Sequence, residues 1–366
     1  MTTPADALIT RVHRELDSGL LPSCQIAWAR HGEIEHFETY GDATNDTDYV
    51  IFSATKAIVA SLVWVLIGEG LIDVDRRVID YIPEFGTNRK DIITVEQVML
   101  HTSGFPHAPM GPRHWSTREG RVAQMANWRL NWEPDSAYEY HPTSAHWVLA
   151  EIIDRVTGGD FRDLVEERIT RPAGITRRVL GAPADEARTV AFMTSVGEPA
   201  TPDELEAALG VRELPVTEVT HDALLMFNNA AVREVGSPGA AGTMTAAELA
   251  LFYQALLHDP AGVWKPEILK DATGRVRNRK PDRWTRVPAN RGLGVIIAGD
   301  DGKANLRGFG HTGSRHTFGH NGAGGQVAWA DPESGLSFVY LTNGLDQHIL
   351  REGRRSISLS SHAAVI

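Results

Sequence analysis

The sequence predicts an α+β fold in which one antiparallel sheet is flanked by helices and interrupted by a mainly helical insertion. Strand-like segments gather near both ends of the chain, whereas the middle is rich in helices and loops. Residues 53–71 are apolar on nearly every side, which is typical of a buried helix. We therefore expect an α/β domain from residues 1–75 plus 286–366, and a mainly helical domain from residues 76–285.

The N-terminal part predicts a helix followed by a β-hairpin. A helical segment covers residues 5–20, and the alternating segments 24–29 and 34–40 are joined by a short turn at 30–33. Alternation on both sides of a glycine-containing turn is the pattern of paired antiparallel strands. The buried helix at 53–71 comes next, and glycines at its end mark where it stops.

The middle of the chain predicts helices separated by long connections. We expect these helices over residues 94–100, 143–156 and 246–257. Thr245 is placed to cap the last of them, with Glu248 three residues further on as the second half of a capping box. Residues 176–235 show the weakest periodicity, and we expect them to form a long excursion over the surface.

The C-terminal part returns to strands. We predict these strands over residues 293–298, 318–321, 326–330 and 336–342. A proline- and glycine-containing turn at 331–335 joins the last two strands, and a final helix begins near residue 347.

Composition excludes several classes of function. The 366 residues carry a formal net charge of −11 and no basic tract, so we expect no nucleic-acid partner. No run of eighteen apolar residues predicts a membrane span, and the first residues lack the basic and apolar parts of a secretion signal. Cys24 is the single cysteine, which excludes an internal disulfide. These features favour a cytoplasmic enzyme.

Fifteen histidines raise the question of a metal site. No His-Glu-x-x-His motif is present, and His141 and His146 are five residues apart, a poor spacing for two ligands on one helix. His101, His107 and His114 share one loop but have no matching carboxylate pattern. We therefore expect no metal and no cofactor.

A catalytic site is predicted at the position where a lysine lies inside the most apolar helix. The chain has only six lysines, and Lys56 is the one with apolar surroundings. Burial there favours the neutral amine, which can accept a proton. Ser53 lies one helical turn earlier on the same face, at the start of the helix, where free N–H groups favour negative charge. The alternative is that Ser53 only caps the helix and Lys56 extends to solvent.

The run FSATK at 52–56 resembles the first motif of the serine β-lactamase and penicillin-binding superfamily. The flanking runs at 68–73, 81–85 and 100–104 are similar to the class C β-lactamase branch, which includes esterases of the family VIII carboxylesterase kind and D-amino-acid peptidases. The likeness extends from about residue 21 to 344. It implies a β-lactamase/transpeptidase-like fold with the active site between the two domains.

The resemblance implies a second motif, Tyr-x-Asn, which is filled by residues 140–142. Tyr140 is then the expected second base, and Tyr138 is its competitor within the same segment. Pro142 stands where the family has Asn. Because proline has no side-chain amide, this substitution argues against recognition of the amide side chain of a β-lactam by the protein.

The third motif, Lys-Thr-Gly or His-x-Gly, is matched by His320, Asn321 and Gly322. The similar run at 311–313 is an alternative, but only the run at 320–322 is followed by a strand pair like that of the family. The resemblance places the oxyanion hole at the backbone N–H groups of Ser53 and Ala323.

We therefore expect a serine hydrolase that cleaves small or medium carboxylic esters through an acyl-enzyme on Ser53. Lys56 and Tyr140 share the serine proton, and the sequence leaves open which of them is the base. Phe105 and Trp329 are expected to line the acyl pocket. A β-lactamase or D-amino-acid amidase is the alternative within this fold, and a catalytically silent ligand-binding protein is the alternative outside enzymes.

Overall fold

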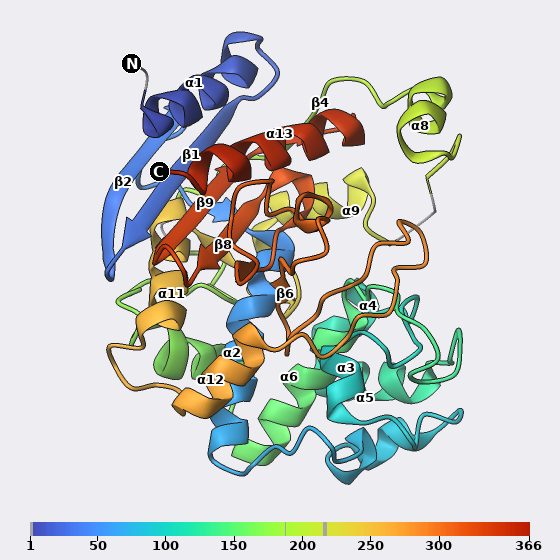
Figure 1. Cartoon of the computed structure of the whole chain (residues 1–366). Coiled ribbons are helices and arrows are strands. Elements are labelled where there is room, and N and C mark those ends of the chain that lie inside the picture. Colours follow the sequence, from blue (N-terminus) through green and yellow to red (C-terminus); the bar gives the residue numbers. More distant parts are fainter. Residues whose placement is uncertain (1–2, 187, 215–217) are drawn as a thin grey trace.

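The computed structural model describes residues 3–186, 188–214 and 218–366. Its main feature is a six-stranded sheet in the order β2-β1-β9-β8-β7-β6, in which every neighbouring pair is antiparallel (Figure 1). Its strands are β1 (Ser23–Arg30), β2 (Glu33–Gly41), β6 (Ile296–Ile297), β7 (Phe318–Gly319), β8 (Val327–Asp331) and β9 (Leu336–Thr342). Cys24 pairs with Thr342, so the two ends of the chain meet inside one sheet. The predicted antiparallel sheet is confirmed.

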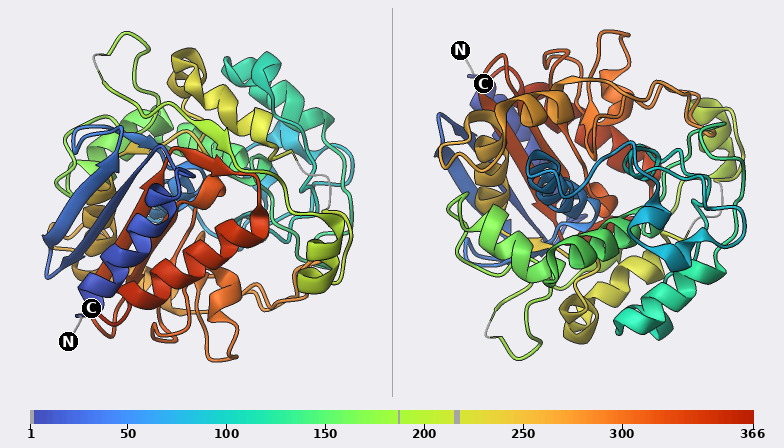
Figure 2. Two further views of the ribbon diagram at one scale, coloured as in Figure 1. Left: turned by 90° about the horizontal axis from the view of Figure 1, so that it is seen from above. Right: turned by 90° about the horizontal axis from the view of Figure 1, so that it is seen from below.

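Helices cover both faces of this sheet. α1 (Pro4–Asp17) and α13 (Ile349–Ala363) contact each other over one face, where the two ends of the chain come together (Figure 2). α11 (Ala246–His258) packs on the other face against β1, β8 and β9. The capping box predicted at Thr245 is present at the start of α11. Although residues 246–258 fall within the segment expected to form the helical domain, this helix belongs structurally with the sheet.

α2 (Thr55–Gly68) is the central helix of the molecule. Thirteen of its fourteen residues are buried, as its uniformly apolar sequence predicts. It contacts α6 (Ser144–Thr157) on the helical side and α12 (Pro266–Gly274) beside the sheet. The indole of Trp64 donates a hydrogen bond of 2.8 Å to Leu293 O, which ties α2 to the segment before β6. The start of α2 is thereby fixed between the two parts of the fold.

The remaining helices are α3 (Val95–Met99), α4 (Pro112–Trp115), α5 (Arg118–Asn127), α7 (Phe161–Val165), α8 (Pro202–Leu209), α9 (His221–Leu225) and α10 (Ala230–Glu234). Two minor strand pairs complete the fold, β3 (Tyr49–Val50) with β5 (Thr243–Met244), and β4 (Thr194–Val196) with β10 (Gly344–Asp346). Strands of two or three residues have no readable periodicity, and these pairs were not predicted. The weakly periodic segment 176–235 contains β4, three short α-helices and a short 3₁₀-helix in its described residues.

Among the described residues, no helix is both long enough and apolar enough to cross a bilayer.

Candidate active site

Ser53 lies in a short 3₁₀-helix, η1 (Phe52–Ala54), directly before α2. The preceding residue, Phe52, has φ = 44°, a left-handed conformation that costs a bulky side chain about 1–3 kcal/mol. Phe52 is 1% exposed and packs edge-on against Phe227, with ring centroids 5.7 Å apart. Burial of this ring holds the strained turn, which presents the half-buried Ser53 to a cavity.

Lys56 lies in the first turn of α2 and is fully buried. Its Nζ is 3.2 Å from Ser53 Oγ and donates a hydrogen bond of 2.7 Å to Gly239 O. Within the described parts of the chain, it forms no ion pair with a carboxylate. Burial, reinforced by the positive charge of Arg291, holds the pKa of this amine well below its usual value, although Glu218 opposes the shift. A neutral amine that donates to Gly239 O has its lone pair available for the serine proton.

Two glycines permit the close contacts around this pair. A Cβ at Gly239 would lie 3.1 Å from Lys56 Nζ, and a Cβ at Gly322 would lie 2.3 Å from Ile51 O. A side chain at either position would therefore displace the amine or the segment that leads to the nucleophile. The glycine of the third motif brings the sheet side of the site against the turn that carries Ser53.

Tyr140 lies over the same pair. Its ring centroid is 5.2 Å from Lys56 Nζ, and its buried hydroxyl has no partner in hydrogen-bond geometry. Burial raises the pKa of this phenol to about 12, although the charge of Arg291 and the nearby Ser53 hydroxyl lower it in part. The competitor Tyr138 accepts a hydrogen bond of 3.1 Å from Arg291 Nε and does not line the cavity with Ser53. The structure therefore brings Tyr140 to the nucleophile.

The third motif forms the opposite wall of the cavity. His320 Nδ1 lies 2.9 Å from Asn321 O, so this nitrogen carries the proton and Nε2 is the free acceptor. Burial lowers the pKa of His320 well below its usual value, which makes the ring neutral. Asn321 Oδ1 accepts a hydrogen bond of 3.0 Å from Ala328 N, which fixes the motif to β8. The alternative His311 is exposed and lies outside this cavity.

The expected oxyanion donors both lie in short 3₁₀-helices. Ser53 belongs to η1, and Ala323 begins a second 3₁₀-helix, η7 (Ala323–Gly325). N–H groups in the first turn of a helix have no partner within that helix, so they are available to a ligand. Both residues line the cavity, which is consistent with the oxyanion hole that the resemblance predicts.

The cavity has a volume of about 420 Å³. It unites Ser53, Tyr140 and Pro142 with residues 320–323, as expected. Phe105 and Trp329 lie elsewhere: both are fully buried, and neither lines the cavity. Phe105 stacks on Trp128, and the indole of Trp329 donates to Ser360 Oγ on the far side of the sheet. The apolar wall comes instead from the buried Pro106 and from the exposed side chains of Val219 and Trp284.

Sequence reasoning missed Arg291 and two buried histidines beside the catalytic pair. Arg291 lines the cavity, and His101 lies 4.9 Å from Tyr140 between ring centroids. Burial is also the main reason that the pKa of His101 and of His146 lies well below the usual value. The sequence pattern raises metal binding as the one role for histidines. Among the described residues, no group of three or more His, Cys, Asp and Glu side chains could hold a metal ion.

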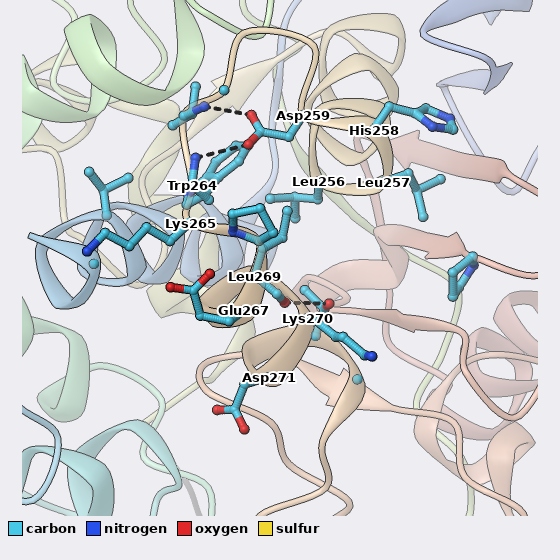
Figure 3. Close-up of a pocket in the computed structure, with 18 of the residues that line it drawn as sticks. Leu256, Leu257, His258, Asp259, Trp264, Lys265, Glu267, Leu269, Lys270 and Asp271 are labelled. Carbon is cyan, nitrogen blue, oxygen red and sulfur yellow. Dashed lines mark hydrogen bonds between the residues drawn. The ribbon is translucent and has the colours of Figure 1, made fainter.

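A larger hollow of about 1480 Å³ lies away from Ser53, around the connection from α11 to α12 (Figure 3). One of its carboxylates, Asp259, accepts hydrogen bonds from Val263 N at 2.7 Å and Trp264 N at 3.1 Å. These bonds shape the turn rather than face a ligand. None of the three predicted catalytic side chains lines this hollow, so the smaller cavity is the candidate active site.

The β-lactamase family matches residues 8–359, which is nearly the whole described chain. The chain belongs to this family. Esterase/beta-lactamase LipL of Mycobacterium tuberculosis is 30% identical over 324 residues, covering 82% of this chain and 70% of LipL. Esterase EstB of Burkholderia gladioli is 28% identical over 345 residues, covering 86% of this chain and 84% of EstB. These relatives support the assignment of the chain as a serine hydrolase of the β-lactamase fold.

Solved structures show the same fold. A penicillin-binding protein homologue from Caulobacter crescentus aligns with a TM-score of 0.79 and 26% identity, covering 99% of this chain and 98% of that one. A family VIII carboxylesterase aligns with a TM-score of 0.77 and 27% identity, covering 98% of this chain and 96% of that one. The predicted β-lactamase/transpeptidase-like fold is confirmed.

Proposed function

We propose that this β-lactamase-family protein is a carboxylesterase that forms an acyl-enzyme on Ser53. The observation that carries the proposal is the amine of Lys56, fully buried and 3.2 Å from Ser53 Oγ. Ser53 Oγ attacks the ester carbonyl and transfers its proton to Lys56 Nζ, while the N–H groups of Ser53 and Ala323 stabilise the oxyanion. The proton then passes to the alkoxide leaving group, and water releases the acyl group by the same path.

The two bases of the predicted pair have different starting states. The lowered pKa of Lys56 makes its amine an acceptor near neutrality, whereas Tyr140, with a pKa of about 12, retains its proton. We therefore assign the general base to Lys56 and assign to Tyr140 the donation of a proton to the leaving group. The Tyr140 hydroxyl is buried beside Ser53 without a competing acceptor, which suits that role.

An ester is favoured over a β-lactam by the walls of the cavity. Pro142 lies on the wall where an amide-reading side chain would be needed, and it has no side-chain donor or acceptor. Pro106, Val219 and Trp284 give part of the lining an apolar character that suits an acyl chain. Lactam hydrolysis is the second candidate, because the relative LipL is named an esterase and β-lactamase.

A substrate screen tests the proposal. We expect p-nitrophenyl butyrate to give a higher kcat/KM than nitrocefin or D-alanine p-nitroanilide under the same conditions. Faster turnover of nitrocefin or of the anilide would assign the protein to the alternative activities of the fold. A folded sample that hydrolyses none of the three and resists a fluorophosphonate, as judged by intact mass, would be a ligand-binding protein.

The pH dependence separates the two candidate bases. If Lys56 is the base, kcat/KM rises through the lowered pKa of its amine and reaches a plateau well below pH 10.5. If the Tyr140 phenolate were the base, the rise would instead fall near pH 12, the pKa of that phenol. A profile of kcat/KM against pH for p-nitrophenyl butyrate, corrected for spontaneous hydrolysis, distinguishes them.

A further inference from the structure

Arg291 is a buried cation in the wall of the catalytic cavity. It lies in the segment before β6 and is 4% exposed. Its Nε donates a hydrogen bond to Tyr138 Oη, whereas its Nη1 is buried without a partner. In residues 3–186, 188–214 and 218–366, no carboxylate lies within 4 Å of its guanidinium. A buried unpaired charge is costly, so packing alone does not account for an arginine here.

The guanidinium faces the proton-transfer pair. Its Cζ lies 5.1 Å from the ring centroid of Tyr140, and Lys56 Nζ lies 5.2 Å from the same centroid. A permanent positive charge at this range disfavours protonation of a neighbouring amine and favours the phenolate of a neighbouring tyrosine. Consistent with this geometry, after the effect of burial the charge of Arg291 is the next cause that lowers the pKa of Lys56, and it also lowers the pKa of Tyr140.

The other titratable groups around the pair do not supply this charge. Burial lowers the pKa of His101, His146 and His320 well below the usual value and that of His141 to about 3, so these four rings are neutral. Glu218, on an exposed segment at the cavity, acts in the opposite direction to Arg291.

The remaining carboxylates near the pair are already engaged. Asp282, which also lines the cavity, accepts hydrogen bonds from Trp284 N at 2.9 Å and Thr285 N at 2.8 Å. Glu139 lies 3.0 Å from His107 Nε2 and 3.4 Å from Arg283 Nη1, so the charge of Arg283 offsets that of this carboxylate. Among the described residues that line the cavity, Arg291 therefore carries the permanent positive charge.

We propose that Arg291 is a positioning residue whose buried, unpaired guanidinium holds Lys56 ready to accept the Ser53 proton at neutral pH and Tyr140 ready to pass a proton to the leaving group. The inference rests on the proposed function for the roles of those two side chains. It requires no contact between Arg291 and the substrate, because the charge acts through the pair.

Three substitutions at one position test this role. Arg291→Met and Arg291→Gln remove the charge and retain much of the side-chain length, whereas Arg291→Lys restores a cation. We expect the rising limb of kcat/KM for p-nitrophenyl butyrate to move up by about one pH unit or more in the first two variants. On that limb each unit is about a tenfold loss of rate, recovered at higher pH. Arg291→Lys should leave the limb near its wild-type position.

Arg279→Met is the matched control, because Arg279 is an exposed arginine of the same segment, lies outside the cavity and forms no ion pair with a described carboxylate. The rising limb of kcat/KM against pH for this control should stay close to that of the wild type. If kcat/KM of Arg291→Met fell by the same factor at every pH, the proposal would be overturned and Arg291 would have only a packing role. A loss confined to an anionic ester, mono-p-nitrophenyl glutarate, would also overturn it, because Arg291 would then bind the substrate.

A second readout needs no substrate. The chain has only six lysines, so ¹³C-lysine labelling allows the Lys56 signal to be followed by NMR and assigned through its absence in Lys56→Met. We expect that signal to titrate at higher pH in Arg291→Met than in the wild type, and an unchanged titration would overturn the proposal. If no ester is hydrolysed, the proposed function fails while this titration still decides the role of Arg291.

Discussion

Ser53→Ala is expected to lower kcat/KM for p-nitrophenyl butyrate by about 10⁴-fold or more, the range found when a serine nucleophile is removed. The loss is large because Ser53 Oγ forms the covalent intermediate, and no other hydroxyl in the described residues lies within hydrogen-bond distance of Lys56 Nζ. The variant should also take up no fluorophosphonate, whereas the wild type should gain the mass of one adduct.

Ser61→Ala is the matched control for this experiment. Ser61 is also buried in α2, but its Oγ donates only to Ile58 O within the helix. We expect its activity and its labelling to match the wild type. Wild-type turnover by Ser53→Ala, or labelling of that variant at another residue, would contradict the assignment of the nucleophile.

Lys56→Met is expected to lower kcat/KM by about 10²- to 10⁴-fold, the usual contribution of a general base. Methionine matches the buried length of lysine but cannot accept the proton of Ser53. Lys270→Met, at an exposed lysine of α12, provides the control and should retain wild-type activity. If Lys56→Met kept more than about a tenth of the activity, Tyr140 or another group would be the base.

The same variant has a measurable effect on stability. Lys56 is neutral when folded and charged when unfolded, so the unfolded state binds more protons at pH values between the lowered pKa and 10.5. The free energy of unfolding of the wild type, relative to Lys56→Met, should therefore increase with pH in that window. The limiting slope is about 1.4 kcal/mol per pH unit. Urea unfolding across this range measures it, and a flat difference would show that folded Lys56 is charged.

Much of the fold could be predicted because its larger elements carry strong periodicity. The hairpin of β1 and β2, the uniformly apolar α2 and the capped α11 all lie close to their predicted positions. The two-residue strands β3, β5, β6 and β7 were missed or overextended, because their pairing depends on partners far away in the chain. Local pattern contains no information about such partners.

The residues of the site also divide into those that local sequence pattern predicts and those whose position depends on distant parts of the chain. Ser53 and Lys56 are one helical turn apart, so their contact could be expected from spacing alone, whereas the position of Tyr140 depended on the family resemblance. Aromatic character was a poor guide to the pocket. Phe105 and Trp329 belong to two different hydrophobic cores, and the exposed Trp284 lines the cavity instead. Arg291 gave no sequence signal, because a single arginine before a glycine does not reveal that it will be buried.

The pairing of β1 with β9 also bears on how the protein matures. The central strands β1 and β9 can pair only after Thr342 has been synthesised, because Thr342 is the partner of Cys24. Contacts between positions so far apart in the sequence slow folding. The wall that carries Ala323 is likewise made late in synthesis. A nascent chain still on the ribosome thus holds its nucleophile and amine without the opposing half of the oxyanion hole, and hydrolytic competence should arise only once translation has passed β9.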